Sequence, residues 1–233
     1  MELYNPQYIE WDLETTAKLL QSKFKDSTVF VIKPSEMLLN TFSLYRNFLF
    51  FDENGRPHFS GTFGAFLHLV KLFENTKEKA VEENRTLKHN TCKISIEEAC
   101  KGDLPVKLVG FSKGCVVINQ LMFELEKLKV IPEVKAFLNH LSAIYWLDGG
   151  HVGRKDAYIT ETEVLKSIVA LQKELVIHVS AYQIRDLNSR WIEREEKEFV
   201  TKLREMKADI KEFQHFMNEP GSLQNHWKVL TKV

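Results

Sequence analysis

One pentapeptide, Gly110-Phe111-Ser112-Lys113-Gly114, constrains the fold of this chain more than any other feature. It closes a short apolar run, residues 106–109, and opens a helical run, residues 115–125. That order predicts a strand, a sharp turn and a helix, with the serine at the tip of the turn. Such a turn holds the serine in a strained backbone conformation and exposes its hydroxyl at the carboxyl end of the strand. We expect both glycines to be required, because a Cβ atom there would collide with the neighbouring strand or helix.

A Gly-x-Ser-x-Gly turn between a strand and a helix is the nucleophile elbow of α/β-hydrolases. In that arrangement the first N–H groups of the helix and the positive end of its dipole face the oxyanion that forms during acyl transfer. Ser112 is therefore the candidate nucleophile, and the N–H of Lys113 is the candidate oxyanion donor. The alternative is an ordinary strand–turn–helix connection without chemistry.

The rest of the chain alternates between the two kinds of periodicity. Strands are predicted at residues 28–32, 106–110, 143–147, 175–179 and 209–213. Helices are predicted after Asp12 and at residues 63–73, 114–128, 132–141, 163–173 and 190–207, with a last amphipathic segment from Ser222. This alternation predicts one α/β domain over residues 1–233, in which helices cover both faces of a mostly parallel sheet. The charged segment 74–103 has no clear periodicity and is interpreted as a solvated insertion.

Composition excludes several classes of partner. The 233 residues carry 32 basic and 32 acidic side chains, so there is no electrostatic footprint for nucleic acid or for an acidic membrane surface. Every apolar run is broken by charges before it reaches about 18 residues, so no membrane span is predicted. The three cysteines form neither a disulfide framework nor a metal-ligand pattern, and no dinucleotide or P-loop motif is present. We expect no cofactor and no metal, and no feature specifies an oligomeric state.

A catalytic serine needs a histidine to take its proton and an acid to orient that histidine. Asp186 lies in the loop after the second strand downstream of the elbow, which is the usual position of the acid, and we prefer it. Asp148 is the other candidate, because it ends the preceding strand and is followed by Gly-Gly-His. Ligands of α/β proteins bind at this end of the strands, so Asp148 and His151 are expected to line the pocket even if they are not triad members. The plain alternatives are a surface ion pair for Asp186 and a turn for Asp148.

Four histidines follow the elbow at plausible positions. His226 comes after the loop 218–222, the kind of connection that delivers the base, and is preferred. His215 ends the last strand and is the alternative base, with a pocket role otherwise. His178 lies inside an apolar strand and is interpreted as a core histidine, whereas His151 precedes the usual position of the base. A metal site at these side chains rests only on an Asp-x-x-His spacing, which is weak evidence.

Several long stretches of the chain carry a family resemblance. They are LVGFSKGCVVINQLMFEL around the elbow, YWLDGGH, YQIRD with Trp191 nearby, and the closing HFMNEPGSLQNHW. Together they resemble a single animal family, which is typified by the human chromosome-2 open-reading-frame protein and described as mitochondrial and α/β-hydrolase-like. The resemblance runs from about Trp11 to Val229 and is weakest over the charged insertion.

The resemblance implies an α/β-hydrolase fold, a serine hydrolase site and mitochondrial residence in place of a cytoplasmic one. By position, the elbow serine of the family falls on Ser112, its Arg-Asp on Arg185-Asp186 and its Asn-His on Asn225-His226. Family members also have an upstream apolar strand with a Pro-Gly-Asp loop before the segment that corresponds to residues 8–14. This chain starts after that strand, so we expect a sheet that lacks an N-terminal strand and an oxyanion hole that lacks its second N–H.

Two hypotheses of function follow. The first is a serine hydrolase that cleaves an ester or thioester, small or acyl-lipid, with Ser112 as nucleophile, His226 as base and Asp186 as acid. The second is a non-catalytic relative of α/β-hydrolases that acts as a mitochondrial binding or assembly factor. The lysine that follows the serine motivates the second hypothesis.

Overall fold

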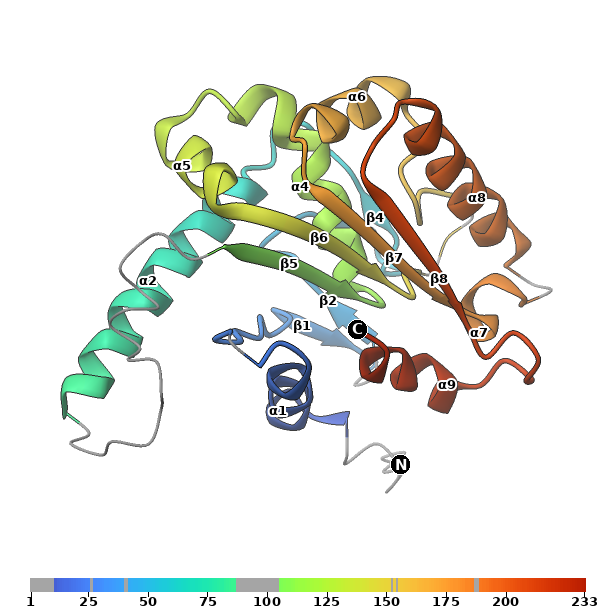
Figure 1. Cartoon of the computed structure of the whole chain (residues 1–233), viewed down its shortest axis with the longest axis horizontal. Helices are drawn as coiled ribbons and strands as arrows, with labels where there is room; N and C mark the ends of the chain where they lie inside the picture. Colours follow the sequence, from blue (N-terminus) through green and yellow to red (C-terminus); the bar gives the residue numbers. More distant parts are fainter. Residues whose placement is uncertain are drawn as a thin grey trace.

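A parallel sheet of four strands forms the centre of the molecule (Figure 1). The computed structural model describes residues 11–25, 27–39, 42–86, 105–151, 153, 155–186 and 189–233. Across the sheet the strands follow one another in chain order: β5 (Val106–Phe111), β6 (Leu141–Leu147), β7 (Glu174–Ser180) and β8 (Ile210–His215). All three neighbouring pairs are parallel, so the carboxyl ends of the strands meet at one edge, where α/β proteins build their sites.

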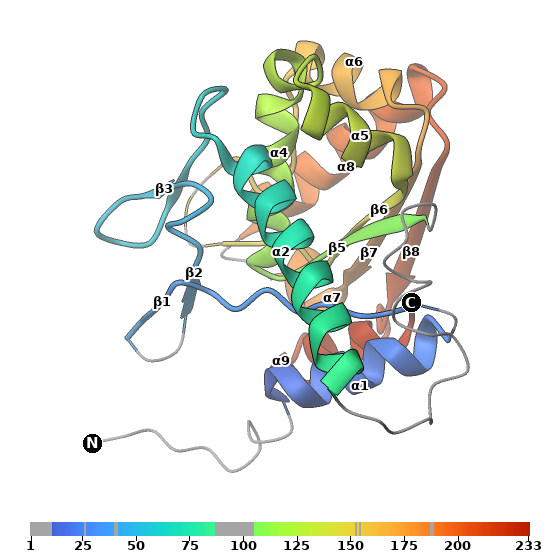
Figure 2. The same ribbon diagram turned by 90° about the vertical axis from the view of Figure 1, so that its left-hand side faces the viewer.

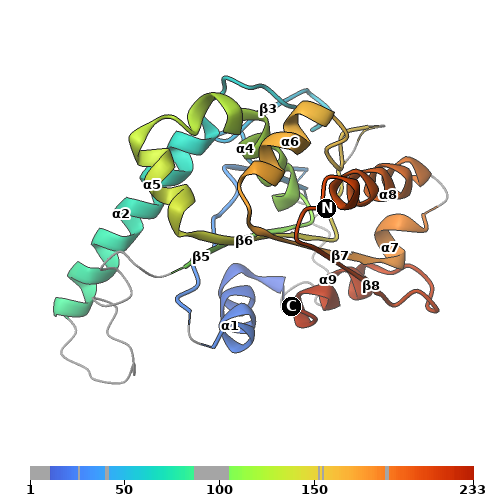
Figure 3. The same ribbon diagram turned by 45° about the horizontal axis from the view of Figure 1, so that its top comes forward.

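Helices cover both faces of this sheet (Figures 1 and 3). One face carries α4 (Gly114–Leu128), α5 (Pro132–His140), α6 (Thr162–Ala170) and α8 (Arg190–Glu205). The other face carries α1 (Leu13–Lys23), α9 (Leu223–Lys228) and the short helix η2 (Val229–Thr231), while α7 (Ala181–Ile184) continues directly from β7. The three layers confirm the predicted α/β-hydrolase-like fold.

Each central strand is apolar on both faces because both faces are covered. In β6, Ile144 and Trp146 join the larger apolar cluster under α4, α6 and α8, whereas Tyr145 and Leu147 join the smaller cluster under α1 and η2. This is the reason that the strand reads as a continuous apolar run and not as an alternating one.

The helix α2 (Ala65–Thr86) packs against α4 through a buried carboxylate. Glu124 of α4 accepts hydrogen bonds from the N–H groups of Gly64, Ala65 and Phe66, at 2.8, 3.0 and 2.9 Å. These N–H groups lie at the start of α2 and have no partner within that helix. The carboxylate of Glu124 supplies their acceptor and also interacts favourably with the positive end of the α2 dipole. The contact fixes α2 against the helix that follows the elbow.

Two small antiparallel pairs lie outside the central sheet, on the same flank of the molecule (Figure 2). They are β1 (Glu36–Leu38) with β2 (Phe42–Leu44), and β3 (Phe50–Phe51) with β4 (Pro57–His58). Much of the aromatic mass between residues 42 and 59 belongs to these pairs. In the described ranges no helix is long and apolar enough to cross a bilayer.

Most of the predicted elements agree with the structure to within a few residues, but two predictions were wrong. Residues 28–32 belong to no helix or sheet, and Phe30 and Ile32 are partly exposed. Residues 74–86, expected to be part of an irregular insertion, continue the helix α2. The remainder of the predicted insertion, residues 87–103, lies outside the described residues.

The misassigned run lies beside the strand that carries the elbow. Val29 packs against the small apolar cluster that contains Val109 and Phe111 of β5, and Phe30 stacks edge-on against Phe73 of α2 with 6.3 Å between ring centres. In the order of the sheet, β5 is the terminal strand, and its outer edge has no strand paired to it among the described residues. The β-rich run and β5 therefore pack against one apolar cluster, and no ladder joins them among the described residues.

Candidate active site

The predicted elbow is present at the end of β5. Ser112 has a φ of +52°, a conformation that few residues other than glycine adopt. Its N–H donates to the carbonyl of Leu147 on β6 at 2.9 Å, and its own carbonyl accepts from the N–H of Cys115 at 3.1 Å. The first bond ties the turn to the neighbouring strand and the second begins α4, so the strained conformation is held from both sides.

The two glycines of the elbow differ in what they do. A Cβ atom at Gly110 would lie 2.8 Å from Ile118 Cδ1 and 2.9 Å from both the Cys115 nitrogen and the Gly114 carbonyl oxygen. A Cβ atom at Gly114 would meet nothing within 4 Å. The expectation that both glycines avoid a collision is thus correct for Gly110 and wrong for Gly114, because the second glycine faces open space.

Lys113 presents its backbone and its side chain to different surroundings. Its N–H and that of Gly114 donate no hydrogen bond to any group in the described part of the chain. The buried ammonium group reaches the flanking hairpins, where it donates to the carbonyl of Gly55 at 3.4 Å and lies 5.6 and 5.9 Å from the ring centres of Phe42 and Phe51. Burial lowers the pKa of this amine. The backbone N–H groups remain available to an anion.

A buried acid and a buried histidine meet at the carboxyl end of β6. Asp148 Oδ2 lies 2.7 Å from His226 Nδ1, and the two side chains are 0% and 5% exposed. Asp148 immediately follows β6 and has a φ of +49°, so the two strands β5 and β6 both end in a strained polar residue. Because the carboxylate faces Nδ1, the proton of a neutral imidazole belongs on Nδ1 and the lone pair on Nε2.

Ser180 completes the surroundings of the acid. Its N–H donates to Asp148 Oδ1 at 2.6 Å and its hydroxyl donates to Asp148 Oδ2 at 2.6 Å. With His226, these groups give the buried carboxylate three short donors, which is what an ion removed from water requires. Sequence reasoning missed Ser180, although a polar residue at the end of the strand next to Asp148 was a usable signal.

The ring of His226 contacts two aromatic side chains. Phe111, the residue before the nucleophile, stacks on one side with 4.5 Å between ring centres, and Tyr182 of α7 lies at 5.0 Å. Trp227 packs against Phe111 at 4.9 Å. Neither ring contact with His226 was predicted, because both depend on the way α9 returns to the sheet.

The short helix α9 carries His226 to the acid. Ser222 caps this helix, because its hydroxyl accepts from the N–H of Asn225 at 3.2 Å. Asn225 in turn donates to Glu219 at 2.8 Å, across the preceding loop. At Gly221 a Cβ atom would lie 3.0 Å from Tyr182 Cα, so a larger residue would push α9 and α7 apart by a few tenths of an ångström. The predicted base therefore lies at the site, on a helix fixed by its own cap.

The structure brings the alternative candidate acid, and not the preferred one, to His226. The carboxylate that contacts His226 belongs to Asp148 and not to Asp186. Asp186 follows the helix α7, which starts directly after β7 and carries the chain away from the strand end. Arg185, the other half of the Arg-Asp pair, donates to the carbonyl of Met217 and joins α7 to the loop after β8.

The other predicted histidines lie around this centre. His215 Nε2 and His178 Nδ1 are 2.9 Å apart, so His215 is engaged by a neighbouring strand and is not the partner of Asp148. Burial and the neighbouring His215 lower the pKa of His178 to about 4, and burial with the nearby Lys232 lowers the pKa of His215. His151 packs near Trp191 of α8, with 5.6 Å between ring centres.

The nucleophile and the base are not hydrogen-bonded to each other. Within the described ranges no hydrogen bond joins Ser112 Oγ to His226, although Phe111 connects the two residues by stacking on the imidazole. In hydrolases without a bound substrate this contact is often long and tightens only when the substrate is present. The described residues also contain no group of three side chains suited to hold a metal ion.

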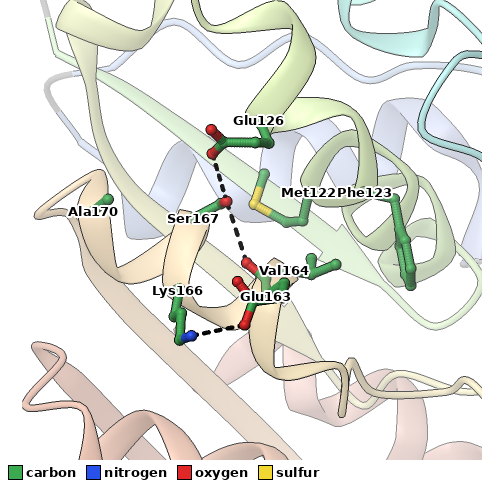
Figure 4. A pocket seen from close by; sticks show the side chains of 8 residues that line it. All are labelled: Met122, Phe123, Glu126, Glu163, Val164, Lys166, Ser167 and Ala170. Carbon is green, nitrogen blue, oxygen red and sulfur yellow. Dashed lines mark hydrogen bonds and ion pairs between the residues drawn. The ribbon is translucent and has the colours of Figure 1, made fainter.

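A surface pocket lies away from this centre, between α4 and α6 (Figure 4). Its polar side chains are already paired with one another: Ser167 donates to Glu126 at 2.9 Å and Lys166 to Glu163 at 2.7 Å. Glu126 is 12 residues beyond the start of α4, which is about 18 Å along a helix. The pocket is therefore separate from the elbow.

Comparison with known proteins places the chain in a family. The C2orf69 family matches residues 2–105 and 101–209. The chain belongs to the C2orf69 family. No solved structure matches it.

Curated relatives extend over nearly the whole chain. It is 35% identical to the mitochondrial protein C2orf69 of Homo sapiens, over 97% of this chain and 67% of that protein. The Mus musculus homolog is 34% identical over 97% of this chain and 71% of that protein, and the Danio rerio homolog is 34% identical over 94% and 64%. The chain is thus a member of a family of mitochondrial proteins, as the resemblance implied.

Proposed function

We propose that this chain is a mitochondrial serine hydrolase that cleaves esters or thioesters. The observation that carries the proposal is the 2.7 Å contact between Asp148 and His226, next to a serine held at a φ of +52° at the end of the adjacent strand. A fully buried acid on a histidine, beside a strained serine, is the arrangement that acyl transfer uses. Asp148 takes the role of the acid in place of Asp186.

In the proposed mechanism His226 Nε2 accepts the proton of Ser112 Oγ as that oxygen attacks the carbonyl carbon of the substrate. The carbonyl π bond breaks to form a tetrahedral oxyanion, to which the N–H of Lys113 donates. The oxyanion then re-forms the carbonyl, the bond between the carbonyl carbon and the leaving oxygen or sulfur breaks, and His226 gives its proton to the departing alcohol or thiol, so that the acyl group stays on Ser112 Oγ. A water molecule, deprotonated by the same histidine, attacks the acyl carbon; the bond from that carbon to Ser112 Oγ breaks, the acid leaves, and His226 returns the proton to Ser112 Oγ.

The surroundings of the base favour a substrate with an apolar acyl group. Phe111 stacks on His226, the tilted ring of Tyr182 contacts it, and Trp227 extends this aromatic surface. Tyr182 and the nearby Leu223 of α9 are each 36% exposed, so apolar surface continues to solvent beside the base. An acyl chain that packed there would bring its carbonyl close to the elbow.

Labelling with a fluorophosphonate probe tests the proposal. The probe reacts with a serine only when that serine is activated, so we expect a single adduct on Ser112. Ser112→Ala and His226→Ala should abolish labelling. Ser167→Ala is the matched control, because that hydroxyl bonds to Glu126 in the separate pocket and should leave labelling unchanged. A folded wild-type chain that takes no label at Ser112 would exclude the proposal.

A non-catalytic role in binding or assembly is the second candidate. The missing hydrogen bond between Ser112 Oγ and His226 in the described residues favours it, as does the unpaired edge of β5. A binding protein should retain its cellular role as Ser112→Ala. Loss of that role in a variant with unchanged folding would exclude this candidate.

A further inference from the structure

We propose that Ser180 is a positioning residue of this site, which fixes the carboxylate of Asp148 in the one orientation that serves His226. The inference rests on the proposed function and deepens it. Ser180 touches neither the nucleophile nor the base in the hydrogen-bond network, and it acts through the acid alone.

Ser180 and the carboxylate of Asp148 form a two-point contact, here called the clamp. One residue binds both carboxylate oxygens: the N–H of Ser180 reaches Oδ1 and its hydroxyl reaches Oδ2, each at 2.6 Å. The backbone N–H holds Oδ1, and the hydroxyl occupies one lone-pair direction of Oδ2, which leaves the other lone pair of Oδ2 for His226. The clamp therefore determines the direction from which Oδ2 accepts the proton of His226 Nδ1.

The hydroxyl of Ser180 binds Asp148 instead of capping the helix α7. Ser180 is the N-cap of α7 and has the extended backbone typical of that position, yet its side chain does not cap the helix. A serine there usually accepts from an N–H of the first helical turn. The hydroxyl instead donates to Asp148, so the local structure gives up a cap and the acid gains a donor.

The contact between Ser180 and Asp148 is shielded from solvent. Ser180 and Asp148 are both fully buried, and the N–H of Asp148 is occupied by the carbonyl of His178 at 2.7 Å. Water therefore does not replace a lost donor at Oδ2 without a rearrangement. If the hydroxyl of Ser180 is removed, the carboxylate keeps its backbone donor at Oδ1 and its histidine at Oδ2.

This predicts a defined kinetic effect for Ser180→Ala. The value of kcat should fall about tenfold or more, because the base is no longer held in line, while KM stays within about twofold. The acidic limb of the kcat/KM profile should move to higher pH, because a carboxylate with fewer donors is more basic and favours the imidazolium form of its partner. A merely structural role would move neither the pH profile nor kcat alone.

The experiment uses the full chain with p-nitrophenyl butyrate as substrate. Ser180→Ala should show the changes above, and Ser180→Thr, which keeps a hydroxyl, should restore most of kcat. Ser142→Ala is the matched control, because that strand serine donates to the carbonyl of Val106 at 3.0 Å, outside the site. Equal kcat and an equal pH profile for wild type and Ser180→Ala would overturn the proposal.

A second readout does not depend on turnover. The proton on His226 Nδ1 should give a low-field NMR resonance in the wild type, and this resonance should shift or disappear in Ser180→Ala. If the wild type neither hydrolyses the ester nor takes the fluorophosphonate, the hydrolase proposal fails, while this resonance still decides the role of Ser180. An unchanged resonance overturns the clamp. If Ser180→Ala does not fold, Ser180→Cys, with a similar volume and a weak donor, takes its place.

Discussion

The two halves of the candidate site differ in burial and in how firmly hydrogen bonds hold their side chains. The acid–histidine half, at the ends of β6 and β7, is buried and holds three hydrogen bonds of 2.6 to 2.7 Å. The serine half, at the end of β5, is partly exposed, and its hydroxyl makes no hydrogen bond to His226 in the described ranges. The acid and the base are preorganised, while the nucleophile has a strained backbone and a side chain that makes no hydrogen bond within the described ranges.

The position of each half in the sheet explains the difference. β6 and β7 have a strand on either side, so their ends are fixed by ladders, by covering helices and by one another. Among the described residues β5 has a strand on one side only, and the run 28–32, which packs against the same apolar cluster, forms no strand. A strand edge left open is free to move and to accept another strand, so the serine half depends more on what covers that edge.

The largest expected effect comes from substituting the acid of the preorganised half. Asp148→Asn removes the buried negative charge that orients His226. The NH2 group of the asparagine then faces one of the donors that Asp148 accepts from, on Ser180 or His226. We expect ester hydrolysis to fall about 1,000-fold or more and the free energy of unfolding to fall by about 3 kcal/mol. Turnover and urea denaturation measure the two effects. Asp186→Asn is the control, and we expect it to keep both values near those of the wild type.

Contradiction would come from the opposite pattern. If Asp186→Asn abolishes turnover and Asp148→Asn does not, the acid that the sequence favoured is catalytic and the observed contact is only structural.

A smaller effect is expected from the elbow, in the serine half. Gly110→Ala places a methyl group 2.8 to 2.9 Å from atoms of Ile118, Cys115 and Gly114, so the unfolding free energy should fall by about 1–3 kcal/mol. Gly114→Ala enters open space at the first position of α4 and should be neutral or stabilise by up to about 1 kcal/mol. Thermal denaturation of the pair measures both. Equal losses for the two variants would mean that the elbow is packed differently.

The smallest effect concerns pH, beside the acid–histidine half. The pKa of His178 is lowered to about 4 in the folded state, whereas an unfolded histidine titrates near 6.5. Below about pH 6.5 the unfolded chain takes up a proton that the folded chain does not, so stability should decline as pH falls from about 6.5 to 4. We expect about 1 kcal/mol from this group at pH 5, and His178→Gln should flatten that part of the stability profile. An identical dependence of stability on pH in the variant would show that His178 does not cause this loss of stability.

The sequence predicted the four strands of the central sheet, the longer helices and the sharp turn at Ser112 because these depend on local order. The elbow and the strand ends are local patterns, and His226 follows a loop of recognisable composition. Asp186 was preferred over Asp148 as the acid, whereas the structure brings Asp148 to His226; this difference depends on α7, a helix of four residues that no periodicity indicates. The run 28–32 was assigned to the sheet because its composition favours strands, but a strand forms only where a partner offers its backbone.

The most direct test of the account is a crystal structure of the chain after reaction with a fluorophosphonate. We predict phosphorus bonded to Ser112 Oγ, a phosphoryl oxygen accepting from the N–H of Lys113, and His226 Nε2 within about 3.2 Å of the serine oxygen. Asp148 should remain on Nδ1 of the same ring. No adduct at Ser112, or an adduct from which His226 stays remote, would contradict the proposal that these three residues act together.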